Sequence, residues 1–370
     1  MGDDTSMMRA GIVGAGFMAA THARAVRSAG GTVVAAVASV PEGRERAVRV
    51  TGAVHGLGTV EELLNRSDVD VVHVCTPNMT HEGFALAAIE NGKHVVCEKP
   101  LATTASAAHR LVAAVAEHGT VGTVPFVYRF HPMVREMRDR VAAGVLGIPS
   151  VVHGSYLQDW LADASATNWR VDATQGGRSR AFADIGSHWF DLFEFILGDP
   201  VQALSAQLST VVERRGDGHP VDTEDAASVQ FRTRAGLLGV AVIAQVAAGR
   251  RNRLHLEISG TSSSLGFDQE RAEELWVGRA DAALDVRRDP ALLSEDAARL
   301  SFLPPGHPQG YQDAFNAFVA DSYATMRGSQ RPGLPTFADG HRASIICDAV
   351  LRSGDEHGAW IEIDQPQDGG

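Results

Sequence analysis

The sequence contains few cysteines and no long hydrophobic run. Its three cysteines, at positions 75, 97 and 347 of 370, match neither a disulfide framework nor a zinc site in number or spacing. No stretch approaches the roughly 18 consecutive apolar residues of a membrane span. The first eight residues are polar and include two aspartates, which is not typical of a signal peptide. We therefore expect a cytoplasmic protein with no structural metal and no membrane partner.

A surplus of basic residues is also missing. The chain has 33 Lys and Arg against 45 Asp and Glu, a net charge of −12, and its basic residues are scattered. A nucleic-acid-binding surface needs clustered basic charge, so we expect no nucleic-acid partner. With 44% hydrophobic and 21% charged residues, the composition is typical of a globular protein. The length is sufficient for two domains.

The first part of the chain, residues 7–125, alternates short apolar strands with amphipathic helices. This alternation predicts an α/β domain with a doubly wound parallel sheet. Strands are expected over 9–13, 32–38, 69–75, 94–97 and 119–126, and helices over 17–28, 60–65, 80–91 and 105–117.

The second part, residues 126–365, is dominated by runs in which apolar residues alternate with polar ones. These runs predict an open, mainly antiparallel sheet in a second α/β domain. The strands are expected over 151–157, 201–212, 227–233, 237–246, 254–258, 274–277 and 360–363. Helices are expected over 132–143, 187–197, 311–326 and 338–353.

A glycine loop follows the first expected strand. Gly14 permits a tight turn, and Gly16 lets the backbone approach a pyrophosphate. Phe17 and Met18 then open a helix whose free N–H groups favour phosphate charge. The strand–turn–helix context predicts a nicotinamide dinucleotide site. Ser39, at the end of the second strand, is neither the acid typical of NAD sites nor an arginine; we favour NAD, with NADP left open.

Two further segments follow apolar strands and are expected at the same edge of the sheet. One contains Thr76, Pro77, Asn78 and His81, and the other contains Glu98 and Lys99, followed by a proline. Ligands of open α/β sheets bind at the carboxyl ends of the strands, so we expect all six residues to contact the cofactor. Lysine can carry a proton when burial or a nearby cation lowers its pKa. A surface lysine in a turn is the alternative for Lys99.

A third cluster opens the helix expected near residue 187. Asp184, His188 and Asp191 are spaced i, i+4 and i+7, which places them on one face of a regular helix. A histidine with a carboxylate one turn away can relay a proton near neutral pH. The alternative is structural: Asp184 caps the helix and His188 is a buried, hydrogen-bonded histidine.

Together, the glycine loop, Glu98-Lys99-Pro100 and the Asp184…His188 motif resemble the Gfo/Idh/MocA oxidoreductases over nearly the whole chain. The resemblance implies an N-terminal Rossmann domain and a C-terminal α/β domain with an open, mainly antiparallel sheet. That sheet commonly forms contacts in homodimers or homotetramers. The resemblance also implies that Lys99, Asp184 and His188 act together on a sugar or polyol hydroxyl.

Further segments are similar to the subgroup that contains levoglucosan dehydrogenase and the sugar dehydrogenases of aminoglycoside pathways. They are 156–160, 168–170, 178–182 and 310–313. This similarity implies that Arg129, Trp169 and Arg170 lie beside the cofactor. It implies substrate contacts by Gln158, Trp160, Arg170, Arg178 and Tyr311. The alternative for Trp160 and Trp169 is a place in the core, and that for Gln158 is a solvated strand position. The alternative for Arg170 and Arg178 is a surface ion pair.

The sequence thus predicts an NAD(P)-dependent oxidoreductase that oxidises a ring hydroxyl, at C3, of a pyranose sugar, glycoside or aminoglycoside. Two alternatives use the same fold: an NAD-retaining glycosidase acting by transient C3 oxidation, and a non-catalytic sugar-sensing regulator. Lys99 and His188 are both candidate proton acceptors. A composition rich in Ala and Arg favours a bacterium of high GC content and a role in antibiotic biosynthesis.

Overall fold

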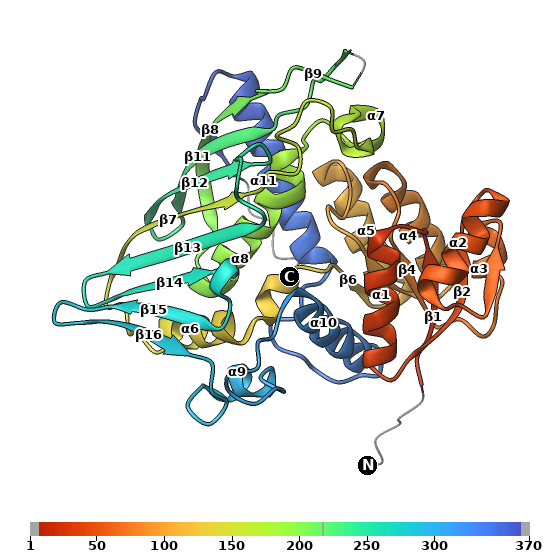
Figure 1. Ribbon diagram of the computed structural model, residues 1–370, viewed down its shortest axis with the longest axis horizontal. Coiled ribbons are helices and arrows are strands. Elements are labelled where there is room, and N and C mark those ends of the chain that lie inside the picture. Colours follow the sequence, from red (N-terminus) through yellow and green to blue (C-terminus); the bar gives the residue numbers. More distant parts are fainter. Residues whose placement is uncertain (1–6, 217, 364–370) are drawn as a thin grey trace. The chain divides into compact units, whose positions relative to one another are not determined.

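The computed structural model describes residues 7–216 and 218–363 and divides the chain into two compact units (Figure 1). The first unit comprises residues 7–127 and Tyr311–Arg342. The second comprises Tyr128–Gly310 and residues 343–363. The change of unit after Val127 lies two residues beyond the expected end of the first domain. The inclusion of Tyr311–Arg342 in the first unit differs from the expected second domain, 126–365, of which residues 364 and 365 lie outside the described part.

The first unit is built on a six-stranded parallel sheet with the order β3-β2-β1-β4-β5-β6. Its central strands are buried along nearly their whole length, as expected for a parallel sheet covered on both faces. This confirms the predicted Rossmann domain. The last strand is much shorter than the expected 119–126. The strands are β1 (Arg9–Val13), β2 (Thr32–Val37), β3 (His55–Leu57), β4 (Val71–Val74), β5 (His94–Cys97) and β6 (Gly122–Thr123).

Helices cover both faces of this sheet. On one face α1 packs beside α2 and α10, and on the other α4 packs beside α3 and α5. Helix α2 was not predicted, because only Ala47 and Thr51 of its side chains are buried and it has no apolar stripe. The helices are α1 (Phe17–Ser28), α2 (Pro41–Thr51), α3 (Val60–Leu64), α4 (His81–Glu90), α5 (Ala105–His118) and α10 (Tyr311–Met326), with a 3-10 turn, η1 (Asn78–Thr80).

Helix α10 belongs to the first unit because its side chains enter that unit's interior. The Tyr323 hydroxyl lies 2.8 Å from Nε2 of His73 on β4, and Arg24 on α1 donates to Gln312 over 2.8 Å. These contacts join residues 250 and 288 positions apart in the sequence. Such pairing has no local sequence signal, so the domain to which α10 belongs was not predictable.

The second unit is built on a nine-stranded sheet with the order β16-β15-β14-β13-β7-β12-β11-β8-β17. Only β12 and β7 pair in parallel among the described strands of this sheet, so the prediction of a mainly antiparallel sheet is confirmed. A two-stranded ribbon, β9 (Arg214–Arg215) with β10 (His219–Pro220), is separate. The nine strands are β7 (Pro149–Leu157), β8 (Val201–Ser209), β11 (Ala226–Thr233), β12 (Leu238–Ala244), β13 (Arg253–Gly260), β14 (Ser264–Asp268), β15 (Glu274–Gly278), β16 (Ala283–Arg287) and β17 (Ile361–Glu362).

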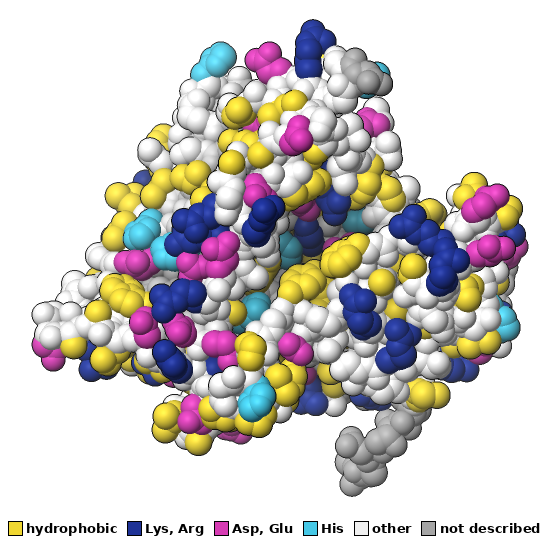
Figure 2. Space-filling model, viewed as in Figure 1, with side chains coloured by type: hydrophobic (Ala, Val, Ile, Leu, Met, Phe, Trp, Pro, Cys, Tyr) yellow, Lys and Arg dark blue, Asp and Glu magenta, His cyan; other side chains and the backbone are white. Residues whose placement is uncertain are grey.

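One face of the nine-stranded sheet packs on helices, with α8 and α6 contributing Trp189, Phe193 and Met133 to a common core. Acidic and basic side chains are intermixed over the region of β13–β15 (Figure 2), and an ion pair of 2.9 Å joins Arg253 to Asp268 there. The helical elements are η2 (Val127–Phe130), α6 (Pro132–Ala142), η3 (Trp169–Val171), α7 (Ala173–Gly176), a π-helical turn, η4 (Phe182–Gly186), α8 (Ser187–Leu197), η5 (Gln269–Arg271), α9 (Glu295–Arg299) and α11 (Phe337–Asp355), which continues from the first unit.

Candidate active site

The glycine loop lies at the carboxyl end of β1, between the ends of β2 and β4. The Gly14 N–H donates to the Val37 carbonyl over 3.1 Å, and a Cβ at Gly14 would lie 2.6 Å from the Cys75 carbonyl oxygen. The φ of Gly14 is +128°. Any other residue here would be strained and would collide with backbone, so the turn requires glycine.

The amino end of α1 fits a phosphate group. A Cβ at Gly16 would meet nothing within 4 Å, so open space adjoins the start of the helix. No side chain caps this end and no acid lies in its first turn, which leaves the N–H groups of Phe17 and Met18 available to an anion. The residues present therefore fit a dinucleotide pyrophosphate. Ser39 is exposed just beyond the end of β2.

The segment after β4 is fixed by its own hydrogen bonds. The Thr80 hydroxyl donates to the Thr76 hydroxyl over 2.7 Å, and Asn78 is buried at the start of η1. The His81 ring nitrogens lie 2.8 Å from the Pro100 carbonyl and 2.9 Å from the Thr76 carbonyl. Burial lowers the pKa of His81, so the ring is neutral and donates its single N–H to one of these two carbonyls. We predicted a cofactor contact for His81; its side chain is instead directed to backbone carbonyls.

The segment after β5 carries Glu98 and Lys99. Lys99 is half-buried, and its peptide bond to Pro100 is cis. The Glu98 side chain turns into the unit, where one carboxylate oxygen lies 3.0 Å from Nε2 of His22 on α1. The buried Glu98 carboxylate is therefore directed to His22 and not to the predicted cofactor contact. Since β2, β1, β4 and β5 are neighbours in one parallel sheet, their carboxyl ends bring the four predicted segments of this unit to one edge.

In the second unit, Asp184 lies on the π-helical turn that precedes α8. One carboxylate oxygen accepts a hydrogen bond of 2.7 Å from the side-chain amide of Gln245, and the other lies 3.4 Å from Nε of Arg170. The Asp184 side chain remains 14% exposed, whereas Gln245 is fully buried. A carboxylate held from two sides and still reachable can orient a ligand hydroxyl.

His188 lies one helical turn further along, in a buried aromatic surround. The centre of its ring lies 5.1 Å from that of Tyr128, which it meets edge-on, and 6.5 Å from that of Tyr156. The two tyrosine hydroxyls are hydrogen-bonded to each other. Burial raises the pKa of Tyr128, to which the nearby Asp184 charge also contributes, so this phenol keeps its proton.

A chain of polar side chains extends from these tyrosines. The Tyr156 hydroxyl donates to Oδ1 of Asn252 over 2.9 Å, and the Asn252 amide donates to the Tyr128 hydroxyl over 3.2 Å. Gln158 donates to the same Oδ1 over 2.7 Å, and its own Oε1 accepts from the Trp160 indole over 2.8 Å. Gln158 and Trp160 thus share one network with the Tyr128–Tyr156 pair that surrounds His188.

Arg170 and Trp169 form a stacked pair on η3. The Arg170 guanidinium lies 4.4 Å from the centre of the Trp169 ring, and this arrangement presents its Nε to Asp184. The Asn168 side chain caps the turn by accepting from the Arg170 N–H over 3.1 Å. The structure therefore joins the predicted residues Arg170 and Asp184 directly.

Three predicted residues have contacts that do not belong to this network. Arg178 is 70% exposed and pairs with Asp355 over 3.0 Å. The Arg129 guanidinium is buried and forms an ion pair with Asp191, so the Asp191 carboxylate is engaged by Arg129 although it lies one turn from His188 on α8. Tyr311 lies in the first unit, where its ring contacts Phe315.

No sequence pattern identifies the residues that hold Asp184 and the tyrosines. Gln245 and Asn252 follow the end of β12 and reach partners 61 and 96 positions away. Gln245 is a single polar residue after an apolar strand, which is typical of any strand end, and Asn252 lies among arginines in the loop before β13. His22 and His73, which were expected as ordinary helix and strand residues, are buried beside Glu98.

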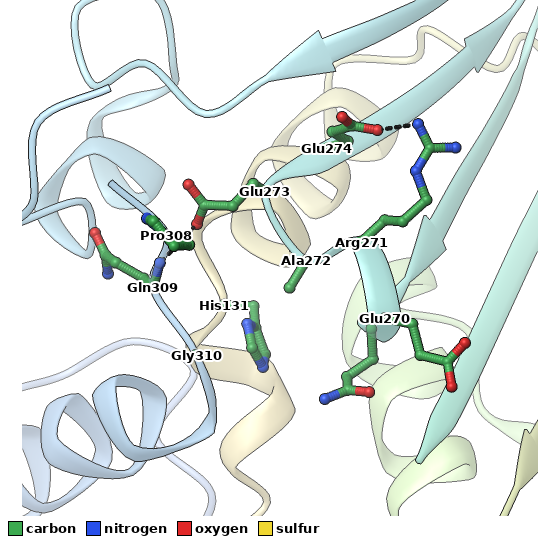
Figure 3. Close-up of a pocket in the computed structure, with 10 residues that line it drawn as sticks. His131, Glu270, Arg271, Ala272, Glu273, Glu274, Pro308, Gln309 and Gly310 are labelled. Carbon is green, nitrogen blue, oxygen red and sulfur yellow. Dashed lines mark hydrogen bonds and ion pairs between the residues drawn. The ribbon is translucent and has the colours of Figure 1, made fainter. Parts of the chain in front are cut away.

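A cavity of about 270 Å³ lies in the second unit (Figure 3). Its His131 ring stacks on Tyr128 at 5.8 Å. Its charged side chains pair with one another or with near neighbours: Arg271 with Glu274, and Glu273 with Arg288 over 2.7 Å. The cavity is lined by His131, Gln269, Glu270, Arg271, Ala272, Glu273, Glu274, Pro308, Gln309 and Gly310.

Comparison with known proteins agrees with this geometry. The model of an oxidoreductase family with an NAD-binding Rossmann fold matches residues 8–126, and that of the GFO/IDH/MocA C-terminal domain matches residues 134–266. The chain is 30% identical to levoglucosan dehydrogenase of Pseudarthrobacter phenanthrenivorans over 97% of this chain and 98% of that protein. It is 37% identical to inositol 2-dehydrogenase 1 of Saccharopolyspora erythraea over 96% of both chains.

Solved structures show the same fold. Levoglucosan dehydrogenase in complex with NADH and levoglucosan superposes with a TM-score of 0.91 at 30% identity, over 98% of this chain and 100% of that one. An oxidoreductase domain protein from Kribbella flavida gives a TM-score of 0.90 at 35% identity, over 98% of this chain and 100% of that one.

The fold and the strand-end site define an NAD-dependent oxidoreductase with a Rossmann domain and a mixed-sheet α/β domain. The chain belongs to the Gfo/Idh/MocA oxidoreductase family. Among the described residues, no helix is long and apolar enough to cross a membrane. Within the same residues, no group of three or more His, Cys, Asp and Glu side chains is arranged to hold a metal ion.

Proposed function

We propose that the protein oxidises the C3 hydroxyl of a pyranose sugar, a glycoside or an aminoglycoside. The observation that carries the proposal is the Asp184 carboxylate, held by Gln245 and Arg170 within the second unit. A carboxylate so fixed can accept hydrogen bonds from neighbouring hydroxyls of a sugar ring. The related levoglucosan dehydrogenase and inositol 2-dehydrogenase support a polyhydroxylated ring as the substrate.

Bound NAD⁺ would supply the hydride acceptor at C4 of its nicotinamide. Gly14, Gly16, Phe17 and Met18 would hold the pyrophosphate through backbone N–H groups, and Ser39 would face the adenosine ribose. The side chains of Trp169 and Arg170 would contact the nicotinamide half.

Three residues of this chain would act on the sugar. Lys99 contacts the reacting oxygen, His188 accepts or relays the hydroxyl proton, and Asp184 orients a neighbouring hydroxyl. Deprotonation of the hydroxyl as the hydride leaves is general-base catalysis, in which the acceptor must lie within hydrogen-bond reach of the proton. Lys99 and His188 are both candidates for this first acceptor.

Further contacts would orient the ring. Gln158 carries an amide that can bond sugar hydroxyls, and the exposed edge of Trp160 offers an apolar surface for ring C–H groups. Arg178 and Tyr311 are proposed to contact the outer part of a longer substrate.

The enzyme is proposed to work as a homodimer or homotetramer formed through the open face of the nine-stranded sheet. That face exposes Leu238, Val240 and Val242 on β12, at 59%, 38% and 45%. Val151 on β7 pairs with Leu238 in register and is 41% exposed on the same face. A row of apolar side chains on a sheet face is typical of a protein–protein interface, and a second copy would cover it. We further propose a cytoplasmic reaction in the biosynthesis of a sugar-containing antibiotic.

A panel of pyranoses, glycosides and aminoglycosides tests the proposed activity, with NAD⁺ and NADP⁺ supplied separately and the reduced cofactor read by absorbance. Stoichiometric reduced cofactor and a 3-keto product, identified by NMR, would support it. Release of aglycone without net reduced cofactor would show the NAD-retaining glycosidase instead. Tight dinucleotide binding without turnover of any member would favour the sugar-sensing regulator.

A further inference from the structure

A continuous chain of buried hydrogen bonds connects the Glu98–Lys99 segment to helix α10 within the first unit. Glu98 Oε1 lies 3.0 Å from His22 Nε2, and His22 Nδ1 lies 2.8 Å from His73 Nδ1. His73 Nε2 lies 2.8 Å from the Tyr323 hydroxyl. His22, His73 and Tyr323 are fully buried, and Glu98 is 6% exposed. Each link is therefore a direct contact between two buried side chains.

The Tyr323 end sets the direction of these hydrogen bonds. Burial raises the pKa of Tyr323 well above 10, so the phenol keeps its proton. His73 is the hydrogen-bond partner of that hydroxyl among the described residues. The hydroxyl therefore donates, and His73 Nε2 accepts. Burial also lowers the pKa of His73 well below 6.5, so its ring is neutral and carries its one proton on Nδ1.

The remaining protons follow from that placement. The His73 Nδ1–H donates to His22 Nδ1, so His22 carries its proton on Nε2 and donates it to Glu98. The reverse direction would require either an imidazolium at His22 or a protonated Glu98, and it would leave the Tyr323 proton without an acceptor in a fully buried place. An added buried charge and an unpaired buried donor both disfavour that arrangement.

The chain ends on the backbone of Lys99. Burial alone would raise the pKa of Glu98, but the net pKa is lowered, and the hydrogen bond from His22 is the largest of the effects that oppose burial. Glu98 is therefore a carboxylate, and its second oxygen accepts the Lys99 N–H over 3.2 Å. His22 thus holds the Glu98 carboxylate in place. The carboxylate in turn holds the backbone N–H of Lys99, from which the Lys99 side chain extends.

We propose that Tyr323, His73 and His22 are positioning residues for Lys99, acting through Glu98 by a one-way chain of donors that begins at the Tyr323 hydroxyl. The catalytic consequence rests on the role proposed above for Lys99. The placement of protons along the chain does not depend on that role, and it can be tested separately.

The proton positions are tested on the full chain labelled with ¹⁵N-histidine, by long-range ¹H–¹⁵N NMR of the imidazole rings at neutral pH. His22→Gln and His73→Gln assign the two signals. The expected result is a neutral His73 protonated on Nδ1 and a neutral His22 protonated on Nε2. In Tyr323→Phe, His73 should no longer be held in the tautomer protonated on Nδ1. An imidazolium at His22, or an Nε2–H ring at His73 in the wild type, would overturn the proposal.

The positioning role is tested by kinetics with a matched control on the same helix. Tyr323→Phe removes one buried hydroxyl from the chain. Ser322→Ala removes a buried hydroxyl one position earlier, which donates to the Phe318 carbonyl and lies outside the chain. Misplacement of a reacting group by about 1 Å can cost on the order of a hundredfold in rate. We expect Tyr323→Phe to lower kcat about tenfold, with KM for NAD⁺ nearly unchanged, and Ser322→Ala to leave kcat unchanged.

Equal kcat values for the two variants would refute the positioning role even if both lose thermal stability. If no sugar is turned over, the proposed function fails while the NMR result still decides the proton chain. If a sugar is turned over but His73 carries its proton on Nε2, the proton chain fails and the proposed function stands.

Discussion

The side-chain amide of Gln245 donates to the Asp184 carboxylate over 2.7 Å, from a position with no exposure to solvent. Gln245 follows β12, and Asp184 lies on the π-helical turn before α8, so the bond joins the sheet to the helical layer of the second unit. π-helical turns in α-helices often occur at functional sites. The contact fixes one oxygen of the carboxylate while the other remains near Arg170.

Replacing Gln245 by leucine should therefore lower activity more than stability. The variant keeps the approximate volume but leaves Asp184 without its amide donor, and loss of a hydrogen bond to a charged group costs about 1.5–3 kcal/mol. If that loss falls on the transition state, kcat/KM drops by roughly ten- to a hundredfold. Steady-state kinetics with the sugar found in the panel, beside thermal melting, measures both effects. A kcat/KM within twofold of the wild type would contradict the role of Gln245.

Lys99→Met and His188→Asn should separate the two candidate proton acceptors. Loss of a general base lowers kcat by about 10²–10⁴-fold. The larger loss identifies the first acceptor, and the double variant should fall little further than the worse single one, because groups acting as a unit are not additive. NADH binding, followed by fluorescence, should change little in each variant. Near-wild-type turnover in both single variants would refute the proposed mechanism.

Features with a local sequence signal were predicted well. Helices over Phe17–Ser28, Ser187–Leu197 and Tyr311–Met326 have the expected ends, because each carries an apolar stripe between clear boundaries. Strand β16 was missed because it lies at the sheet edge and four of its five residues are exposed, which removes the apolar alternation. The parallel pairing of β12 with β7 also has no signal within either strand.

The site was predictable only where residues close in sequence act together. The glycine loop and the Thr76 and Lys99 segments follow strands, so the sheet order brings them to one edge. Asp191 has the spacing of a relay partner for His188, yet it binds Arg129, which is 62 positions away. The spacing assumed a regular helix from residue 184 onward, whereas the π-helical turn ends at Gly186, between Asp184 and His188, and the ion pair engages Asp191.

Ser39 should control the choice between NAD and NADP. It is exposed at the end of β2, where an acid binds the adenosine ribose hydroxyls and repels a 2′-phosphate. Ser39→Asp should raise the ratio of kcat/KM for NAD⁺ over NADP⁺ by about tenfold or more, since 1.4 kcal/mol corresponds to a factor of ten. Ser39→Arg should shift the ratio in the opposite direction. Unchanged ratios in both variants would place the ribose away from Ser39.

His131 should make the protein less stable in acid. Its ring is buried against Tyr128 and Phe267, and this burial lowers its pKa from 6.5 to about 4. Below pH 6.5 His131 binds a proton in the unfolded chain but stays neutral in the folded chain. The stability present above that pH is therefore lost as the pH falls towards 4. His131→Phe should remove up to one proton from this dependence, about 1.4 kcal/mol per pH unit. Urea unfolding from pH 7 to pH 5 measures it, and parallel pH dependences for the two proteins would contradict the account.

A charge on the open face of the nine-stranded sheet should dissociate the proposed oligomer. Val240 is 38% exposed there and lies between Gln230 of β11 and His153 of β7 in register. Val240→Asp would place a carboxylate in the buried interface, where an unpaired charge is strongly unfavourable. Light scattering after size-exclusion chromatography should show a smaller species for this variant. Leu292→Asp is the matched control, because Leu292 is 76% exposed outside the sheet and its replacement should leave the mass unchanged. A wild type that is already monomeric, or an unchanged mass for Val240→Asp, would show that this face is not the interface.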